Sequence, residues 1–169
     1  MSADGLENYR TLLSRVDELC RRTHEAFGEE ITCRAGCDAC CRHLSIFSVE
    51  AAALRQALAE LPPGERESVR SFAAGAQENR CPLLHDGLCL LYRARPIICR
   101  THGLPLLLLR NGERSVDFCP ENFRGLQSIP GGAVIDLERL NMMLATINAL
   151  YLQAHPGPER ITLAQTLAG

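Results

Sequence analysis

The sequence predicts a mainly α-helical fold: a small helical domain with an irregular, cysteine-rich centre and one short β-hairpin. Apolar residues recur at helical spacing towards both ends of the chain, whereas residues 81–119 lose this periodicity and are punctuated by Pro, Gly and Cys. No repeat or linker divides the 169 residues, which are enough to build a hydrophobic core. Residues 1–169 are therefore predicted to form a single domain.

Residues 4–30 are predicted to form the first flanking helix. Asp4 stands at the capping position, and Glu7 follows three residues later. Cys20 falls on the apolar stripe of this helix, so we expect it to be a small buried residue rather than a ligand. The stripe consists of Leu6, Tyr9, Leu13, Val16, Cys20 and Phe27.

Two shorter helices are predicted next. Ser48 can cap a helix over residues 49–61, which stops at Pro62. Another helix, over residues 65–77, follows the turn at Gly64. Because the connection is short, the two are expected to form a helical hairpin.

The β-hairpin is predicted around Asn111 and Gly112, since an Asn-Gly pair favours a two-residue turn. Residues 104–110 and 113–118 supply its strands.

The second flanking helix is predicted over residues 136–155, with Asp136 as its cap and Pro156 just beyond its end. Residues 159–169 either form a short docked helix or stay loose, and the sequence leaves both open. The apolar positions of the long helix are Leu137, Leu140, Leu144, Ile147 and Leu150.

Eight of the nine cysteines lie between positions 33 and 119, in loops and at predicted helix ends. They occur in CRAGCDACC, CPLLHDGLC, RPIICR and FCP, which share no periodicity. Thiolates select zinc, copper(I) or iron-sulfur clusters over hard cations. We therefore predict that the irregular centre binds metal, with these ligands: Cys33, Cys37, Cys40, Cys41, Cys81, Cys89, Cys99 and Cys119.

The number of sites follows from the number of thiols. Four thiolates complete one tetrahedral zinc site or hold one cubane cluster, so eight allow two sites or one larger assembly. Side chains of neighbouring residues point in different directions. We therefore expect one of Cys40 and Cys41 to join the compact group, while the other reaches a second metal or bridges.

The spacing favours an iron-sulfur cluster, for example of the 4Fe-4S type, and leaves zinc open. Cys37 and Cys40 form a pair of the zinc type, but seven residues separate Cys81 from Cys89. A ligand cysteine followed by Pro, as at Cys81 and Cys119, recurs in bacterial ferredoxins.

Three other interpretations remain open. Positions 33, 37, 40 and 41 also match one face of a helix, so some cysteines could serve core packing. The cysteines could form structural disulfides, although their odd number fits this poorly. A zinc site could be purely structural, holding the helices and the hairpin together.

Composition limits the partners and the compartment. The net charge of -2 gives no reason to expect nucleic acid or an anionic membrane as partner, and no apolar run is long enough to span a bilayer. The 18 basic residues are all arginine, which excludes a lysine-dependent phosphate loop or Schiff base. The N-terminus does not read as a targeting segment, so we expect a cytoplasmic protein, in which disulfides are rare.

The ordered segments CRAGCDACC, CPLLHDGLCLLYRARPIICR and FCP resemble the CxxCxxCC family of zinc- or iron-chelating domains, the YkgJ-type cysteine-cluster proteins. The resemblance covers about residues 33–119 and implies a metal-chelating role for the cysteines of these segments. It also marks Tyr92, Arg95 and Pro96 as a recurrent element before Cys99. The first gap in this chain holds three residues, one more than the family name implies.

Side chains around the cysteines are candidates to support the metal. Buried metal-thiolate groups carry negative charge, which nearby arginines can offset by donating to sulfur. Arg95 and Arg100 lie closest to Cys99 in the sequence, and Tyr92 can also donate. His102 is the first candidate for a spare ligand.

Two functions of different classes follow. The first is a metal-binding module for metal handling, structure or electron transfer; its protein partner is unknown. The second is an iron-sulfur enzyme or enzyme component, for example one related to protein lysine methylation, because flagellin lysine methylases contain a similar cysteine region. A substrate pocket beside the metal would distinguish the two, and the sequence alone identifies none.

Overall fold

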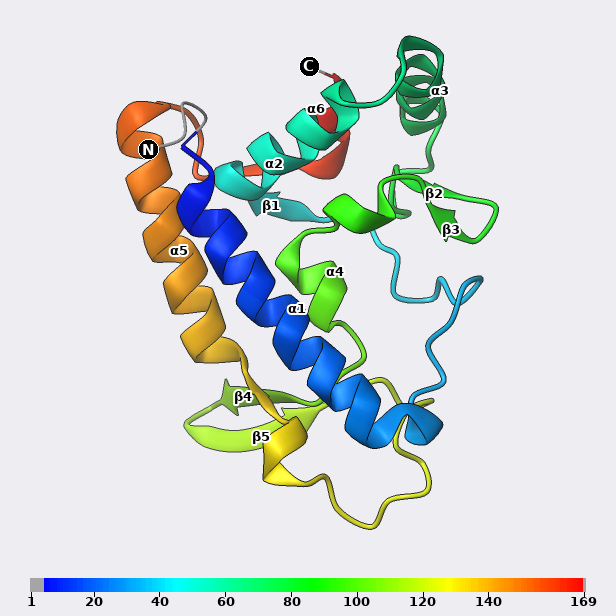
Figure 1. Cartoon of the computed structure of the whole chain (residues 1–169), viewed down its shortest axis with the longest axis vertical. Helices are drawn as coiled ribbons and strands as arrows, with labels where there is room; N and C mark the ends of the chain where they lie inside the picture. Colours follow the sequence, from blue (N-terminus) through cyan, green and yellow to red (C-terminus); the bar gives the residue numbers. More distant parts are fainter. Residues whose placement is uncertain (1–4, 169) are drawn as a thin grey trace.

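Two long helices, α1 (Glu7–Phe27) and α5 (Leu137–Ala154), run side by side along one flank of the molecule (Figure 1). The computed structural model describes residues 5–168, so Asp4 lies outside the described residues. Helix α1 begins after Leu6 and is followed by the 3-10 helix η1 (Gly28–Glu30). Among residues 5–168, no helix has both the length and the apolar character needed to cross a bilayer.

The first hydrophobic core lies between α1 and α5. Tyr9, Leu12 and Val16 of α1 are buried against Leu140 and Leu144 of α5. Leu12, rather than the expected Leu13, occupies the centre of the stripe, and Leu13 packs at its edge. Both residues fit a helical period, so only the position of the neighbouring helix decides between them.

Helix α5 starts where the sequence predicts. The Asp136 side chain accepts a hydrogen bond of 3.0 Å from the backbone N–H of Arg139, as an N-cap residue does. The helix ends at Ala154, before Pro156. Leu150 remains half exposed, so the apolar face is shorter than its spacing predicts.

A second core joins α2 (Ser48–Ala59), α3 (Pro63–Ala74) and α6 (Leu163–Ala168). Helix α6 contacts both α2 and α3, so the C-terminal segment completes the predicted pair of helices. Strand β7 (Arg160–Thr162) pairs antiparallel with β1 (Ser45–Phe47) and brings this segment back to the domain. Of the two states expected for residues 159–168, the structure has the docked one.

The boundaries of α2 and α3 differ by one to three residues from the prediction. Ser48 is the first residue of α2, and Phe47 takes the cap position. Helix α3 starts at Pro63, before Gly64. Proline is favoured in the first turn of a helix because its missing N–H would have no partner there.

The predicted hairpin is present as β4 (Leu106–Arg110) and β5 (Glu113–Asp117). Asn111 and Gly112 both have positive φ, 53° and 82°, as the two-residue turn requires. Strand β6 (Ile135–Asp136) adds to β4 in parallel and leads into α5.

The cysteine-rich centre contains more regular structure than predicted. A second hairpin, β2 (Leu84–His85) and β3 (Leu88–Cys89), turns at Asp86 and Gly87, again with positive φ. It is followed by the 3-10 helix η2 (Tyr92–Ala94) and the five-residue helix α4 (Ile97–Thr101), which packs against α1. A further 3-10 helix, η3 (Gly131–Ala133), precedes β6. The fold is thus mainly α-helical, with short strands.

Candidate metal centre

The eight cysteines of the centre fall into two groups of neighbours. The pKa of Cys37 is raised by its small degree of burial and by the negative charges of Cys33, Cys40 and Cys119 when these ionise. The corresponding neighbours of Cys99 are Cys81, Cys89 and Cys41. We call Cys33, Cys37, Cys40 and Cys119 the first thiol set. Cys41, Cys81, Cys89 and Cys99 form the second thiol set.

Cys40 and Cys41 mark the boundary between the sets. They are adjacent in sequence, and Cys40 has the largest charge effect of any side chain on Cys41. Cys40 nevertheless lines a cavity together with the other three cysteines of the first set, whereas Cys41 does not. Cys40 thus borders the cavity and Cys41 does not, although the two side chains also interact directly.

The first thiol set is assembled by loops that meet at Gly103. A Cβ atom built on Gly103 would lie 3.3 Å from Sγ of Cys33 and 3.5 Å from Cβ of Cys119. The backbone N–H of Cys119 also donates to the carbonyl of Gly103. Residues 33–41 come to this point in irregular backbone, held by turns such as Cys37 N–H to Arg34 carbonyl.

Asn122 ties these loops together, a role that the sequence does not predict. Its side chain is 1% exposed. The amide nitrogen donates to the carbonyl of Gly103 at 2.8 Å and approaches Sγ of Cys33 at 3.4 Å, while the amide oxygen accepts from the backbone N–H of Thr32 at 2.9 Å. Its place three residues after Cys119 was the only sequence signal, and that signal is weak.

Gly103 offers a test of this junction. Its φ is +87°, so Gly103→Ala strains the backbone and also pushes against Cys33 and Asn122. We expect this variant to lose about 2 to 3 kcal/mol of unfolding free energy. The matched control is Gly112→Ala, with a φ of +82° and open space around the added methyl group. It should lose only about 1 kcal/mol. Equal losses in urea denaturation would contradict the close packing at Gly103.

The second thiol set combines regular and irregular structure: Cys89 ends strand β3 and Cys99 lies in α4, whereas Cys41 and Cys81 lie in irregular backbone. Cys81, which precedes β2 by three residues, and Cys89 both contact the second core. The backbone N–H of Cys81 donates to the carbonyl of Cys41 at 3.2 Å, which fixes the second segment to the first. Cys99 joins them from helix α4.

Backbone N–H groups favour the thiolate form of two cysteines of the second set. Those of Leu83 and Leu84 lower the pKa of Cys81, and that of Leu91 lowers the pKa of Cys89. The N–H of Leu84 also donates to the Cys81 carbonyl at 3.0 Å. Burial raises both pKa values by more, so the net direction is upwards.

The second set cannot ionise fully by itself. Burial raises the pKa of Cys99 to about 12, and thiolates at Cys81, Cys89 and Cys41 raise it as well. Burial also raises the pKa of Cys41 to about 12, with Cys40, Cys81 and Cys89 adding to the effect. A bound cation removes both obstacles, since its positive charge replaces the lost hydration and offsets the repulsion. This donor set therefore fits a soft metal ion or cluster.

Arg95 lies beside the second set. Its positive charge lowers the pKa of both Cys89 and Cys99, and it donates to the carbonyl of Cys99 at 3.4 Å. The guanidinium stacks on the exposed ring of Tyr92, 3.6 Å from the centroid. Arg95 is thus positioned to offset thiolate charge, whereas Tyr92 supports Arg95.

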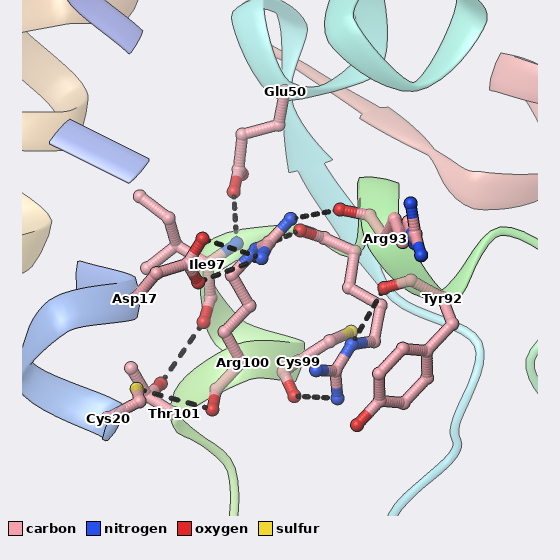
Figure 2. A network of polar contacts seen from close by, with 10 residues as sticks. Asp17, Cys20, Glu50, Tyr92, Arg93, Ile97, Cys99, Arg100 and Thr101 are labelled. Carbon is pink, nitrogen blue, oxygen red and sulfur yellow. Dashed lines mark hydrogen bonds and ion pairs between the residues drawn. The ribbon is translucent and has the colours of Figure 1, made fainter. Parts of the chain in front are cut away.

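Arg100 has a different environment from Arg95. Its guanidinium forms an ion pair with Asp17 of α1 at 2.8 Å and donates to the carbonyls of Arg93 and Arg95 (Figure 2). The carbonyl of Arg100 accepts a weak hydrogen bond from Sγ of Cys20. Arg100 therefore fastens α4 and η2 to α1, and Cys20 lies half-buried at the same junction, outside both thiol sets.

The loops of the two sets touch each other. A Cβ atom on Gly87, at the tip of the β2–β3 hairpin, would lie 3.3 Å from Cα of Gly36 in the loop of the first set. Both glycines have positive φ. The two sets are therefore neighbours in space as well as in sequence.

In this structure the thiols do not converge on one metal position. All nine cysteines are free, so the structure contains none of the disulfides left open above. Within residues 5–168, no three Cys, His, Asp or Glu side chains lie close enough to hold one metal ion as they stand. His102 is exposed and lines the same cavity as the first set.

Comparison with known proteins identifies the family of the chain. No curated protein and no solved structure matches the chain. A family model described as "Putative zinc- or iron-chelating domain" matches residues 32–120, which is more than half of the 169 residues and contains both thiol sets. The chain belongs to the CxxCxxCC family of zinc- or iron-chelating domains.

Proposed function

We propose that the protein binds two metal centres, one in each thiol set. Membership of the family supports zinc or iron binding in general. The observation that carries the proposal further is the division of the eight thiols into two sets of four, with the adjacent residues Cys40 and Cys41 on different sides. Four thiolates are the number that a tetrahedral zinc ion or a cubane cluster takes.

Binding has to draw the thiols of each set together. Three cysteines of the first set lie in residues 33–41, which form no helix or strand. In the second set, Cys89 is held by a hairpin and Cys99 by a helix, so we expect this set to need less rearrangement. Metal binding should release protons from both sets, because thiolate rather than thiol is the ligand.

The two sets differ in surroundings, and we assign them different roles. The thiols of the second set are half-buried, and Cys81 and Cys89 pack against a hydrophobic core, so its metal would mainly stabilise the fold. Cys33, Cys37 and Cys40 of the first set are exposed, and its metal would be accessible. A reducing compartment such as the cytoplasm would keep these thiols available.

The kind of metal is tested by measuring zinc, iron and acid-labile sulfide per chain in protein purified without oxygen. We propose iron-sulfur clusters, since backbone N–H groups favour the thiolate forms of Cys81 and Cys89, an effect that also stabilises clusters. Iron with equal sulfide and a brown colour is the expected result. If zinc is the only metal found, the centres hold zinc ions and not clusters. A chain with no metal would contradict the proposed function.

The metal-free chain should become less stable at high pH. The pKa of Cys99 is about 12 in the folded chain and close to 8.5 in an unfolded one. The unfolded state therefore loses its proton first, and stability falls as the pH rises above about 9. We expect a loss of roughly 2 kcal/mol from Cys99 between pH 8.5 and 10.5.

Urea denaturation at the two pH values measures this loss. Cys99→Ala, in the same metal-free state, should show a smaller loss, because this thiol no longer ionises on unfolding. Metal-loaded protein should not show the Cys99 contribution, since its thiol is already deprotonated. An identical pH dependence of Cys99→Ala and the unaltered chain would contradict the buried, protonated state of Cys99.

An enzyme, or part of one, is the second candidate, because one observation favours it: the first thiol set borders a cavity.

A further inference from the structure

A cavity of about 660 Å³ lies next to the first thiol set. Its size is within the range of pockets that hold small organic ligands. The first set contributes all four of its cysteines to the wall, and none of the second set takes part. Whatever metal the first set holds therefore borders this cavity.

The wall of the cavity is mostly apolar. Strand β4 contributes Leu106 and Leu108, helix α4 contributes Ile97 and Ile98, and α5 contributes Leu144. These elements belong to the folded framework around the first core, so the cavity is walled by secondary structure rather than by loops alone.

The charges in the wall are largely compensated. Glu50 is buried, and its two carboxylate oxygens accept backbone N–H groups of Phe47 and Ile97. Asp117 pairs with Arg110, and Glu121 pairs with Arg124. The guanidinium of Arg160 lies over the ring of Phe47 and donates to the carbonyl of Ser45. The cavity thus offers apolar contact and no strong preference for a charged ligand.

We infer that the cavity binds a small, predominantly apolar organic molecule, with its polar end at the first thiol set. Apolar walls bury the body of such a molecule, and the end that meets the thiol set would carry a nitrogen, oxygen or sulfur donor for the metal. This inference rests on the proposed function only for that donor contact. The first set is then the reactive side of the protein and the second set is the structural one.

Two probes of different chain length test the inference: 1-methylimidazole and 1-hexylimidazole. Each is titrated by calorimetry into protein loaded with Co²⁺, whose visible absorption also reports a donor beside the metal. Burial of each additional methylene strengthens binding roughly fourfold, so the five extra methylenes of the hexyl compound should strengthen binding on the order of a thousandfold. Equal affinities, or a cobalt spectrum unchanged at saturation, would overturn the inference.

Two leucines on strand β4 give a matched pair of variants. Leu108 lines the cavity, whereas its neighbour Leu109 is 54% exposed and points to the other face of the strand. Leu108→Trp should fill part of the cavity and reduce the advantage of the hexyl chain by at least tenfold. Leu109→Trp should leave it unchanged. If both variants, or neither, reduced the advantage of 1-hexylimidazole, its hexyl group would bind outside this cavity.

The experiments distinguish two outcomes: that the cavity does not bind the apolar ligand, and that the protein does not bind metal. A chain that takes up no cobalt contradicts metal binding. In that case, the same comparison of chain lengths and of the two tryptophan variants on metal-free protein still tests the cavity. If Leu108→Trp does not fold, the comparison of the two probes on the unaltered chain decides by itself.

Discussion

Replacing Cys99 with serine is expected to remove one of two metal centres and to leave the other in place. Cys99 belongs to the second thiol set, and a serine hydroxyl is a poor ligand for a soft metal. The first set shares no ligand with it, so its metal should remain. Cys119→Ser should remove the first centre and spare the second. The metal content of each purified variant, per folded chain, is the measurement.

Cys20 provides the control for these variants. It is a half-buried free thiol outside both sets, so Cys20→Ser should keep both centres. Circular dichroism of each variant separates loss of a ligand from loss of the fold. If Cys99→Ser and Cys119→Ser both lost all metal while staying folded, the eight thiols would form one assembly and not two.

Replacing Arg100 with methionine is expected to lower the free energy of unfolding by about 3 kcal/mol. The Arg100 side chain is only 10% exposed and holds Asp17 together with two backbone carbonyls (Figure 2). Methionine fills a similar volume but donates nothing, so these acceptors lose their partner. Because Asp17 is half exposed to water, most of the loss should come from the two carbonyls.

Arg93 is the matched control for Arg100. Its side chain is exposed, and its contribution to this network is a backbone carbonyl that any residue provides. Arg93→Met should therefore change the unfolding free energy by no more than about 0.5 kcal/mol. Denaturation of both variants in urea, in the metal-free state, makes the comparison. Similar values for the two would show that the Arg100 contacts contribute little.

The sequence predicted the elements that depend on local signals. Asn111 and Gly112 specify their turn by conformation alone, and Asp136 caps α5 through a contact three residues away. The same kind of signal was overlooked at Asp86 and Gly87, where the flanking strands have only two residues each. Helix α4 was missed because its five residues are too few to show a period.

The grouping of the cysteines depends on contacts between distant segments, and the sequence could not provide it. Cys33 and Cys119 meet at Gly103, and Cys41 meets Cys81 through a backbone hydrogen bond. The expectation that Cys40 and Cys41 serve different centres rests on the divergence of successive side chains, and it stays a prediction. Asn122 was missed, since its role depends on Thr32 and Gly103, which lie far from it along the chain.

The central claim is that neighbouring cysteines serve different centres, and two double variants test it most directly. Cys119→Ser removes the first centre in both. Adding Cys40→Ser affects only that same centre, so one centre per chain should remain. Adding Cys41→Ser removes a ligand of the second set, so no metal should remain. Equal metal content in the two double variants, measured on folded protein, would contradict the assignment of Cys40 and Cys41 to separate sets.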